Sequence, residues 1–250
     1  MGHRVTTLNV NTIEPAGNTL TIGASGDSVV LADDVKSNTY KDAGGNTLFV
    51  SNGSGTLSSV NSGFGDALKL LSTTTISSAV SSVDFTSGID TTYKEYIFKF
   101  FNIQGATNNK DFRFQVNASG EADYNETMTT TFIHVVVNED GNNSSLAYNT
   151  AVDQAQGTAK QALMYEVSAA GTHADGGGAG ELHLFNPSST TYVKHFYSRC
   201  QTMNGDATPP YAHDDFCAGY INTTAAITQV TFEMESGNIA AGKIKMYGVL

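Results

Sequence analysis

Short runs of alternating apolar and polar residues occur along most of this chain and predict β-strands. Between residues 112 and 117, Phe112, Phe114 and Val116 alternate with three polar residues. A period of two places successive side chains on opposite faces, so this run predicts a strand with one buried and one half-exposed face. Clusters of Gly, Asn and Ser separate the runs and predict turns. We therefore expect an all-β protein.

The part of the chain after residue 65 contains about ten runs of this kind. Tyr96, Phe98 and Phe100 fall on one face of their run, while Ile97 and Ile103 fall on the other. Apolar residues on both faces are typical of a central strand in a sandwich. The pattern predicts an antiparallel β-sandwich that is jelly-roll-like. The runs are residues 69–76, 79–85, 93–103, 112–116, 129–138, 161–169, 181–186, 192–201, 216–222, 227–234 and 242–249.

The stretches between these runs are expected to be loops, with one exception. Residues 146–160 are ambiguous, and the only short helix is expected near residues 151–156. Residues 171–180 are rich in Gly, which gives the backbone unusual freedom and predicts a loop.

A phrase that occurs twice organises the first sixty residues. Residues 17–23, GNTLTIG, return as residues 45–51, GNTLFVS, and each copy runs into a second turn and another short β-prone piece. This pattern predicts strands and hairpins of about four residues each, which are too short to bury much apolar surface alone. Several identical chains wrapped around one axis would share a core, so a β shaft is favoured. The alternative is a flexible Gly/Ser/Thr linker.

The Gly-rich residues 61–66 mark the boundary between two expected domains. Residues 1–64 form the shaft or attachment segment, with a polar excursion at 33–42 between the two copies of the repeat. Residues 65–250 form the β-sandwich head, where the strands become longer and aromatic residues more frequent.

The charge balance excludes some partners. The net charge is −11, from 13 basic and 24 acidic residues. A nucleic-acid-binding protein needs basic stripes and an anionic membrane surface attracts basic segments, so neither partner is expected. The apolar runs are also too short for a membrane-spanning helix. The first residues lack the apolar core of a signal peptide, so synthesis in the cytoplasm is expected. Cys200 and Cys217 either pair across neighbouring strands or remain as buried thiols.

An enzymatic function is not expected. No Gly-x-Ser-x-Gly motif is present, and Ser25 only approaches that pattern. A glycosidase needs two acids on adjacent strands, and nothing in the sequence brings together any two of its candidate acids. We therefore expect no catalytic residues. The candidate acids are Glu166, Glu181, Glu233 and Glu235.

Metal ions and other cofactors are not expected either. His173, His183, His195 and His213 lack the spacing of a known metal site, although histidines on strands can converge. Surface or packed histidines are the favoured interpretation. Calcium is a weaker alternative, because Asp140-Gly141-Asn142 and Asp214-Asp215 supply oxygen atoms but the twelve-residue binding loop is missing.

A binding surface is expected on residues 201–216, which we interpret as a long connection with two prolines, an aromatic residue and three acids. Long loops on a rigid sandwich commonly carry recognition, and aromatic rings beside Asp and Asn suit sugars. The alternatives are a rigid crossover between sheets or a contact between subunits. The candidate ligand-binding residues are Asn204, Asp206, Tyr211, His213, Asp214 and Asp215.

The closing residues 227–250 contain a strand, a Gly-rich turn and a last strand that finishes Tyr247-Gly248-Val249-Leu250. This ending resembles that of virion structural proteins from tailed phages, of the tail fibre or appendage type known from marine phages. Residues 84–103 resemble these proteins too, and the N-terminal repeat is similar to a fibre shaft. The resemblance covers roughly half of the chain. Its motifs are structural, so it implies no catalytic residue.

The resemblance implies a homotrimer in the virion. Its N-terminal region would contact other virion proteins, and its head would attach to a glycan or protein on the host surface. The chain is shorter than many fibres, which fits a short fibre, a spike or a capsid-attached appendage. The alternative function is architectural: capsid decoration, or a tail adaptor without receptor binding.

Overall fold

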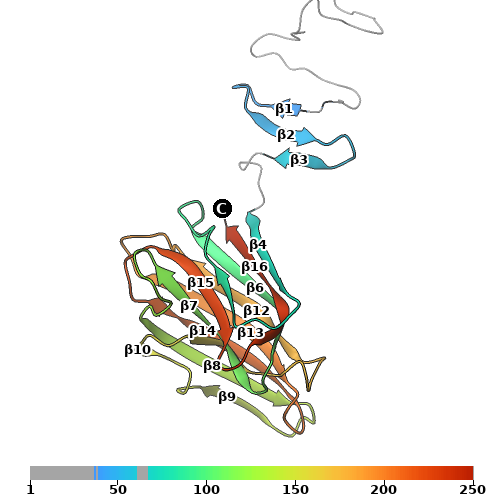
Figure 1. Ribbon diagram of the computed structural model, residues 1–250, viewed down its shortest axis with the longest axis vertical. Helices are drawn as coiled ribbons and strands as arrows, with labels where there is room; N and C mark the ends of the chain where they lie inside the picture. The colour runs from blue at the N-terminus through green and yellow to red at the C-terminus, as the bar shows by residue number, and fades with distance from the viewer. Residues whose placement is uncertain (1–36, 38, 61–66, 250) are drawn as a thin grey trace, which may run out of the picture. The chain divides into compact units, whose positions relative to one another are not determined.

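The computed structural model describes residues 37, 39–60 and 67–249. These residues form antiparallel β-sheets without a helix, which confirms the all-β prediction (Figure 1). No helix in the described part of the chain is long and apolar enough to cross a membrane. The described residues belong to two units, one within residues 1–64 and one within residues 65–250.

The N-terminal unit contains a three-stranded antiparallel sheet in the order β1-β2-β3, with strands Thr39–Lys41, Thr47–Ser51 and Leu57–Val60. Strands were expected in the second copy of the repeat and after it, and β2 and β3 confirm them. The end of the polar stretch at 33–42, where no strand was predicted, forms β1 and pairs with β2. The first copy, residues 17–31, lies outside the described residues.

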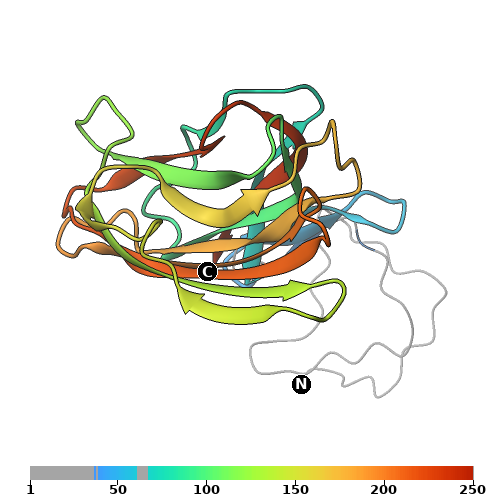
Figure 2. The ribbon, with the colours of Figure 1, turned by 90° about the horizontal axis from the view of Figure 1, so that it is seen from below.

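The larger unit is a sandwich of two sheets, which Figure 2 shows as stacked layers. The smaller sheet has the order β11-β7-β15-β5. Its strands are β5 (Ser82–Phe85), β7 (Lys110–Ala118), β11 (Gln161–Val167) and β15 (Ile227–Met234).

The larger sheet has nine strands in the order β10-β8-β14-β13-β12-β6-β16-β4, and β9 also pairs with β8. Every pairing in it is antiparallel. Its strands are β4 (Leu68–Ile76), β6 (Glu95–Gly105), β8 (Met128–Asn138), β9 (Ser144–Tyr148), β10 (Ala155–Gly157), β12 (Gly177–Phe185), β13 (Lys194–Asn204), β14 (Tyr211–Ile221) and β16 (Ile239–Val249).

Eight strands, four from each sheet, are connected in the order of a jelly roll. One set of four neighbours is β4-β16-β6-β12, and the other is β5-β15-β7-β11. The chain crosses between the sheets at each step except the one from β7 to β11. Two insertions interrupt this plan: β8, β9 and β10 follow β7, and β13 and β14 follow β12. The inserted strands all join the larger sheet and extend it beyond β12.

Aromatic rings fill the space between the two sheets of the jelly roll. Phe98, Phe100, Phe112 and Phe232 are each at most 1% exposed. Phe100 and Phe232 meet edge to face at 5.2 Å, and Phe112 and Phe232 stack at 5.8 Å. Both geometries are favoured by the quadrupoles of the rings, which add to the gain from burial. The expected face of Tyr96, Phe98 and Phe100 is therefore the core face.

The strand β6 departs from simple alternation near its end. Asn102 has a φ of 50°, and the register of β6 against β16 shifts near this point. An irregularity of this kind turns the following side chains to the opposite face. Ile103, which the alternation placed on the outer face, is therefore part of the core.

Two local expectations are wrong because loops and polar contacts override the pattern. Gln115 and Asn117 were expected to be half-exposed, but both are buried, at 0% and 5% exposure. The Gln115 side chain donates to the carbonyls of Glu126, Thr158 and Ala159, so neighbouring loops cover this face.

The short helix expected at residues 151–156 is also wrong, since strand β10 begins there and pairs with β8. The expected loop at 171–180 ends early, because residues 177–180 are part of β12. Glycine is needed there: a Cβ at Gly180 would lie 2.5 Å from the Arg199 carbonyl oxygen. Cys200 and Cys217 are both buried free thiols, and burial raises the pKa of each thiol well above its usual value.

Candidate functional site

The stretch 201–216, expected to be one long connection, is mostly a strand hairpin. Strand β13 continues to Asn204, β14 begins at Tyr211, and only residues 205–210 form the turn. The pairing is continuous from Lys194 opposite Ile221 to Asn204 opposite Tyr211. The predicted ligand-binding residues therefore lie on two strands and their turn, and they fall into three separate places.

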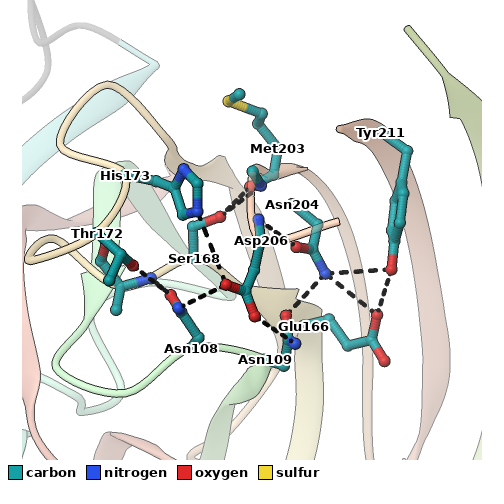
Figure 3. A network of polar contacts seen from close by, with 12 residues as sticks. Asn108, Asn109, Glu166, Ser168, Thr172, His173, Met203, Asn204, Asp206 and Tyr211 are labelled. Carbon is teal, nitrogen blue, oxygen red and sulfur yellow. Dashed lines mark hydrogen bonds and ion pairs between the residues drawn. The ribbon is translucent and has the colours of Figure 1, made fainter. Parts of the chain in front are cut away.

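The first place is a polar network at the hairpin end (Figure 3). Asn204 is 1% exposed, and its amide donates to the side-chain oxygen of Asn109 at 2.9 Å. The Tyr211 hydroxyl donates to the Glu166 carboxylate at 3.0 Å. Burial and this carboxylate raise the pKa of Tyr211 to about 12, so the hydroxyl remains a donor at neutral pH. The polar groups of these side chains are therefore already engaged with one another.

Asp206 ties the turn to two other loops. Its carboxylate accepts hydrogen bonds from the amides of Asn108 and Asn109, at 2.9 and 3.0 Å, and His173 lies 3.8 Å away. Asn108 in turn accepts from the Thr172 hydroxyl at 2.9 Å. The network therefore links three segments at this end of the sandwich, and its geometry indicates a structural role.

The second place is a cluster on the inner face of the inserted strands. His213 and Asp215 lie on β14, and Asp215 pairs in register with His134 on β8. The His134 Nδ1 atom is 2.8 Å from Asp215 Oδ1, and the rings of His134 and His213 are 4.5 Å apart. Each of the three residues offers a ligand atom, and these atoms lie within 4.8 Å of one another. The group can therefore hold a metal ion.

Strand β11 supports this cluster from the opposite sheet. The Tyr165 backbone N–H donates to Asp215 Oδ2 at 2.7 Å, and the Tyr165 carbonyl lies 3.2 Å from His213 Nδ1. Burial and the neighbouring His134 lower the pKa of His213 to about 4, so its imidazole is neutral at pH 7. Burial raises the pKa of Asp215 despite its hydrogen bonds.

The third place is the outer face of the larger sheet, where Asp214 points away from its two neighbours. Arg199 binds the Asp214 carboxylate through Nε at 3.1 Å and through Nη2 at 2.7 Å. This bidentate pair lowers the pKa of Asp214. Because Asp214 and Asp215 face opposite sides of the strand, they do not form a joint calcium site.

The same outer face carries a group of rings, most of them half-buried. Phe216 is 40% exposed and stacks with Tyr197 at 6.3 Å, and Tyr197 stacks on His183 at 4.4 Å. A shallow, mainly apolar depression of about 630 Å³ lies over these strands. We call its main lining residues the aromatic face: Thr129, Thr131, Phe185, His195, Tyr197, Phe216 and Tyr220.

The sequence analysis missed several of these residues. His134 lies between Ile133 and Val135 in a strand-forming run, on the same parity as Phe132, whose ring is buried. A histidine at an inward position of an apolar strand is a signal that could have identified it. Phe216 and Tyr197 were missed because a ring on the outer face of a strand looks like a core residue in a sequence.

Comparison with known proteins identifies no relative: no family model matches this chain, and no curated protein sequence matches it.

Proposed function

We propose that this chain is a structural protein of a tailed-phage virion: a homotrimeric tail fibre or spike-like appendage whose jelly-roll unit attaches to the host surface. The observation that carries this proposal is the aromatic face. Apolar surface that gathers around one depression, with the exposed ring of Phe216 on its strand β14, is a feature of interaction sites. The jelly roll itself occurs in both capsid and lectin domains, which is compatible with the proposal but does not specify it.

The chemistry of the aromatic face suits a sugar. The exposed ring of Phe216, beside the half-buried ring of Tyr197, offers an apolar surface on which the C–H face of a pyranose can pack. The hydroxyl groups of Thr129, Thr131 and Tyr220 line the same depression and can exchange hydrogen bonds with sugar hydroxyls. A surface glycan of the host is therefore the proposed ligand.

The N-terminal sheet supports an oligomer. Its strands have three to five residues, and Leu57 and Val60 are 54% and 45% exposed. A sheet this small buries little apolar area within one chain, so copies of it would gain stability by packing together. Three heads on one shaft would also raise avidity for a repetitive surface although each contact is weak.

The first test is the mass of the protein in solution, measured by light scattering. We expect a trimer for the full-length chain and a monomer for a chain that starts at Gly65. A trimer that survives the truncation would place the oligomer contacts in the head. A monomer in both cases would contradict the fibre proposal.

The second test is binding to a panel of bacterial surface glycans. We expect the Phe216→Ala variant to bind about tenfold more weakly than the wild type, a loss of about 1.4 kcal/mol. The matched control is Phe101→Ala, since Phe101 is 42% exposed on β6 but does not line the depression. Equal losses in both variants would contradict the aromatic face as the ligand site.

The architectural alternative uses the same surface differently. An exposed apolar face is equally suited to burial against another virion protein, as in capsid decoration or a tail adaptor. In that case Phe216→Ala would abolish incorporation into particles, and the wild type would bind no glycan. Particles that incorporate Phe216→Ala but no longer attach to cells would favour host binding.

A further inference from the structure

We propose that His134, His213 and Asp215 form a binding site for one divalent transition-metal ion, on the inner face of the inserted strands. This site is independent of the proposed attachment function, because these side chains point to the inside of the sandwich while the aromatic face lies outside.

The hydrogen bonding of His213 leaves one ring nitrogen available. Nδ1 lies 3.2 Å from the Tyr165 carbonyl oxygen, which can only accept, so Nδ1 carries the proton. Nε2 then has a free lone pair. Within the described part of the chain this atom is buried without a hydrogen-bond partner, in a residue that is 1% exposed. Native proteins rarely leave such a group unsatisfied, and a bound cation would satisfy it.

The donor set matches the preferences of zinc and related ions. Two imidazole nitrogens and one carboxylate oxygen are the ligands of many sites for zinc, cobalt and non-haem iron. The three ligand atoms already lie within 4.8 Å of one another, so small side-chain rotations would bring them around one ion. The hydrogen bond between His134 and Asp215 would give way to two bonds to the metal.

Strand β11 provides the surrounding hydrogen bonds that metal ligands usually have. The Tyr165 N–H orients Asp215, and the Tyr165 carbonyl fixes the tautomer of His213. Such partners orient ligands and raise their affinity for the metal. The ion would also compensate the negative charge of Asp215, which is completely buried.

The site has one accessible side. The His134 side chain is 13% exposed, whereas Asp215 is 0% exposed. An ion can therefore enter past His134, and water can supply the remaining ligand. The metal would connect β8, β14 and, through Tyr165, β11, so we expect it to stabilise the inserted strands against the smaller sheet.

The test is a titration of the untagged, chelator-treated full-length protein with Co²⁺, followed by its visible absorption. We expect one Co²⁺ per chain, displaced by Zn²⁺, with absorption typical of a four- or five-coordinate nitrogen and oxygen site. The His213→Gln variant loses a ligand and should bind Co²⁺ at least about 100-fold more weakly, because even the loss of a hydrogen-bond partner of a ligand costs about 10–100-fold in affinity.

Two further variants keep the result interpretable. His134→Gln changes a residue nearer the surface, and it tests the same site if His213→Gln does not fold, as judged by circular dichroism. His195→Gln is the matched control on the outer face and should bind as the wild type does. The proposal is overturned if the wild type binds no Co²⁺, if a folded His134 or His213 variant binds it equally well, or if His195→Gln abolishes binding.

Discussion

The eight jelly-roll strands and the inserted strands enclose two different interiors. Between the jelly-roll strands the interior consists of packed rings, among them Phe98, Phe112 and Phe232. Beneath β8 and β14, buried polar groups lie beside the apolar ones: Thr130 is 4% exposed and His213 is 1% exposed. One sheet runs through both regions, so the difference is in the side chains and not in the backbone.

This difference has a physical reason. An apolar interior needs only shape complementarity, whereas each buried polar group needs a defined partner. The inserted strands extend beyond the jelly roll, where β11 is the edge of the smaller sheet. There, partners from loops and from the backbone of β11 satisfy most of the polar groups, although the buried His213 Nε2 atom has none among the described residues. Substitutions that shorten side chains in the jelly-roll core should therefore be strongly destabilising. The inserted region instead holds the buried polar groups that can bind a ligand.

The largest expected effect tests the aromatic interior. Phe232→Ala should lower the free energy of unfolding by about 3–5 kcal/mol, because it leaves a cavity among four rings. Phe216→Ala on the aromatic face should change it by about 0.5 kcal/mol or less. Chemical denaturation of both variants measures the contrast. Equal losses would mean that Phe216 is part of a core.

A smaller effect is expected from the polar interior. The Thr130 hydroxyl lies 2.7 Å from Gln161 Oε1 and accepts from the Gln154 N–H at 2.9 Å. Thr130→Val keeps the shape but leaves the Gln154 backbone N–H unpaired and leaves Gln161 Oε1 with only the Gln154 side-chain amide at 3.2 Å, so we expect a loss of about 1–3 kcal/mol. The exposed neighbour Thr131→Val is the control and should be nearly neutral. If Thr130→Val left the free energy of unfolding unchanged, hydrogen-bond partners would not be important for the stability of this region.

The buried ammonium of Lys194 gives a pH-dependent test of the same region. Lys194 is 0% exposed and donates to the carbonyls of Tyr192 and Thr223, each at 3.0 Å. Burial lowers its pKa, an effect that Glu126 partly offsets. A lysine whose pKa is lower in the folded state destabilises the fold where it is charged, and this cost disappears as pH rises through the folded pKa towards 10.5.

We therefore expect the unfolding free energy of the wild type, relative to Lys194→Met, to increase between pH 7 and pH 10. Denaturant unfolding at the two pH values measures it. A relative decrease over this range would show that the charged form is the favoured one in the folded protein.

The smallest effect is expected on the outer face. Arg199 and Asp214 form a bidentate pair, but the Arg199 side chain is 69% exposed. Arg199→Ala should cause the smallest loss of stability of these variants, and the loss should vanish near 1 M salt because exposed pairs are screened. A larger or salt-independent loss in urea unfolding would place this pair in a buried contact.

Most of the jelly roll could be predicted from the sequence, because its strands follow the rule of apolar residues inside. Alternation located β7 and β15 within a few residues of their ends. Alternation also located most of the inserted hairpin, as residues 192–201 and 216–222, but it missed the hairpin end, where β13 continues to Asn204 and β14 begins at Tyr211. Its inward positions include Asn204, His213 and Asp215, so the period-two pattern of apolar residues disappears and the stretch looks like a loop.

The candidate site was predictable only in part. Asn204, Asp206 and Tyr211 do gather at one end, but hydrogen bonds with Asn109 and Glu166 occupy them. Such partners come from other loops, and their approach depends on the three-dimensional path of the chain. The aromatic face is missing from the sequence analysis for the same reason, since its residues come from four different strands.

The position of β16 has a consequence for biosynthesis. It lies between β4 and β6 in the larger sheet and pairs with both. β4 ends at Ile76 and β16 begins at Ile239, so a ribosome adding about 5–20 residues per second needs roughly ten to thirty seconds between them. Any strands that β4 and β6 form during that time lack their β16 partner, and unpaired strand edges can pair with neighbouring nascent chains. An assembly chaperone that covers these edges, or folding only after release from the ribosome, would prevent such pairing.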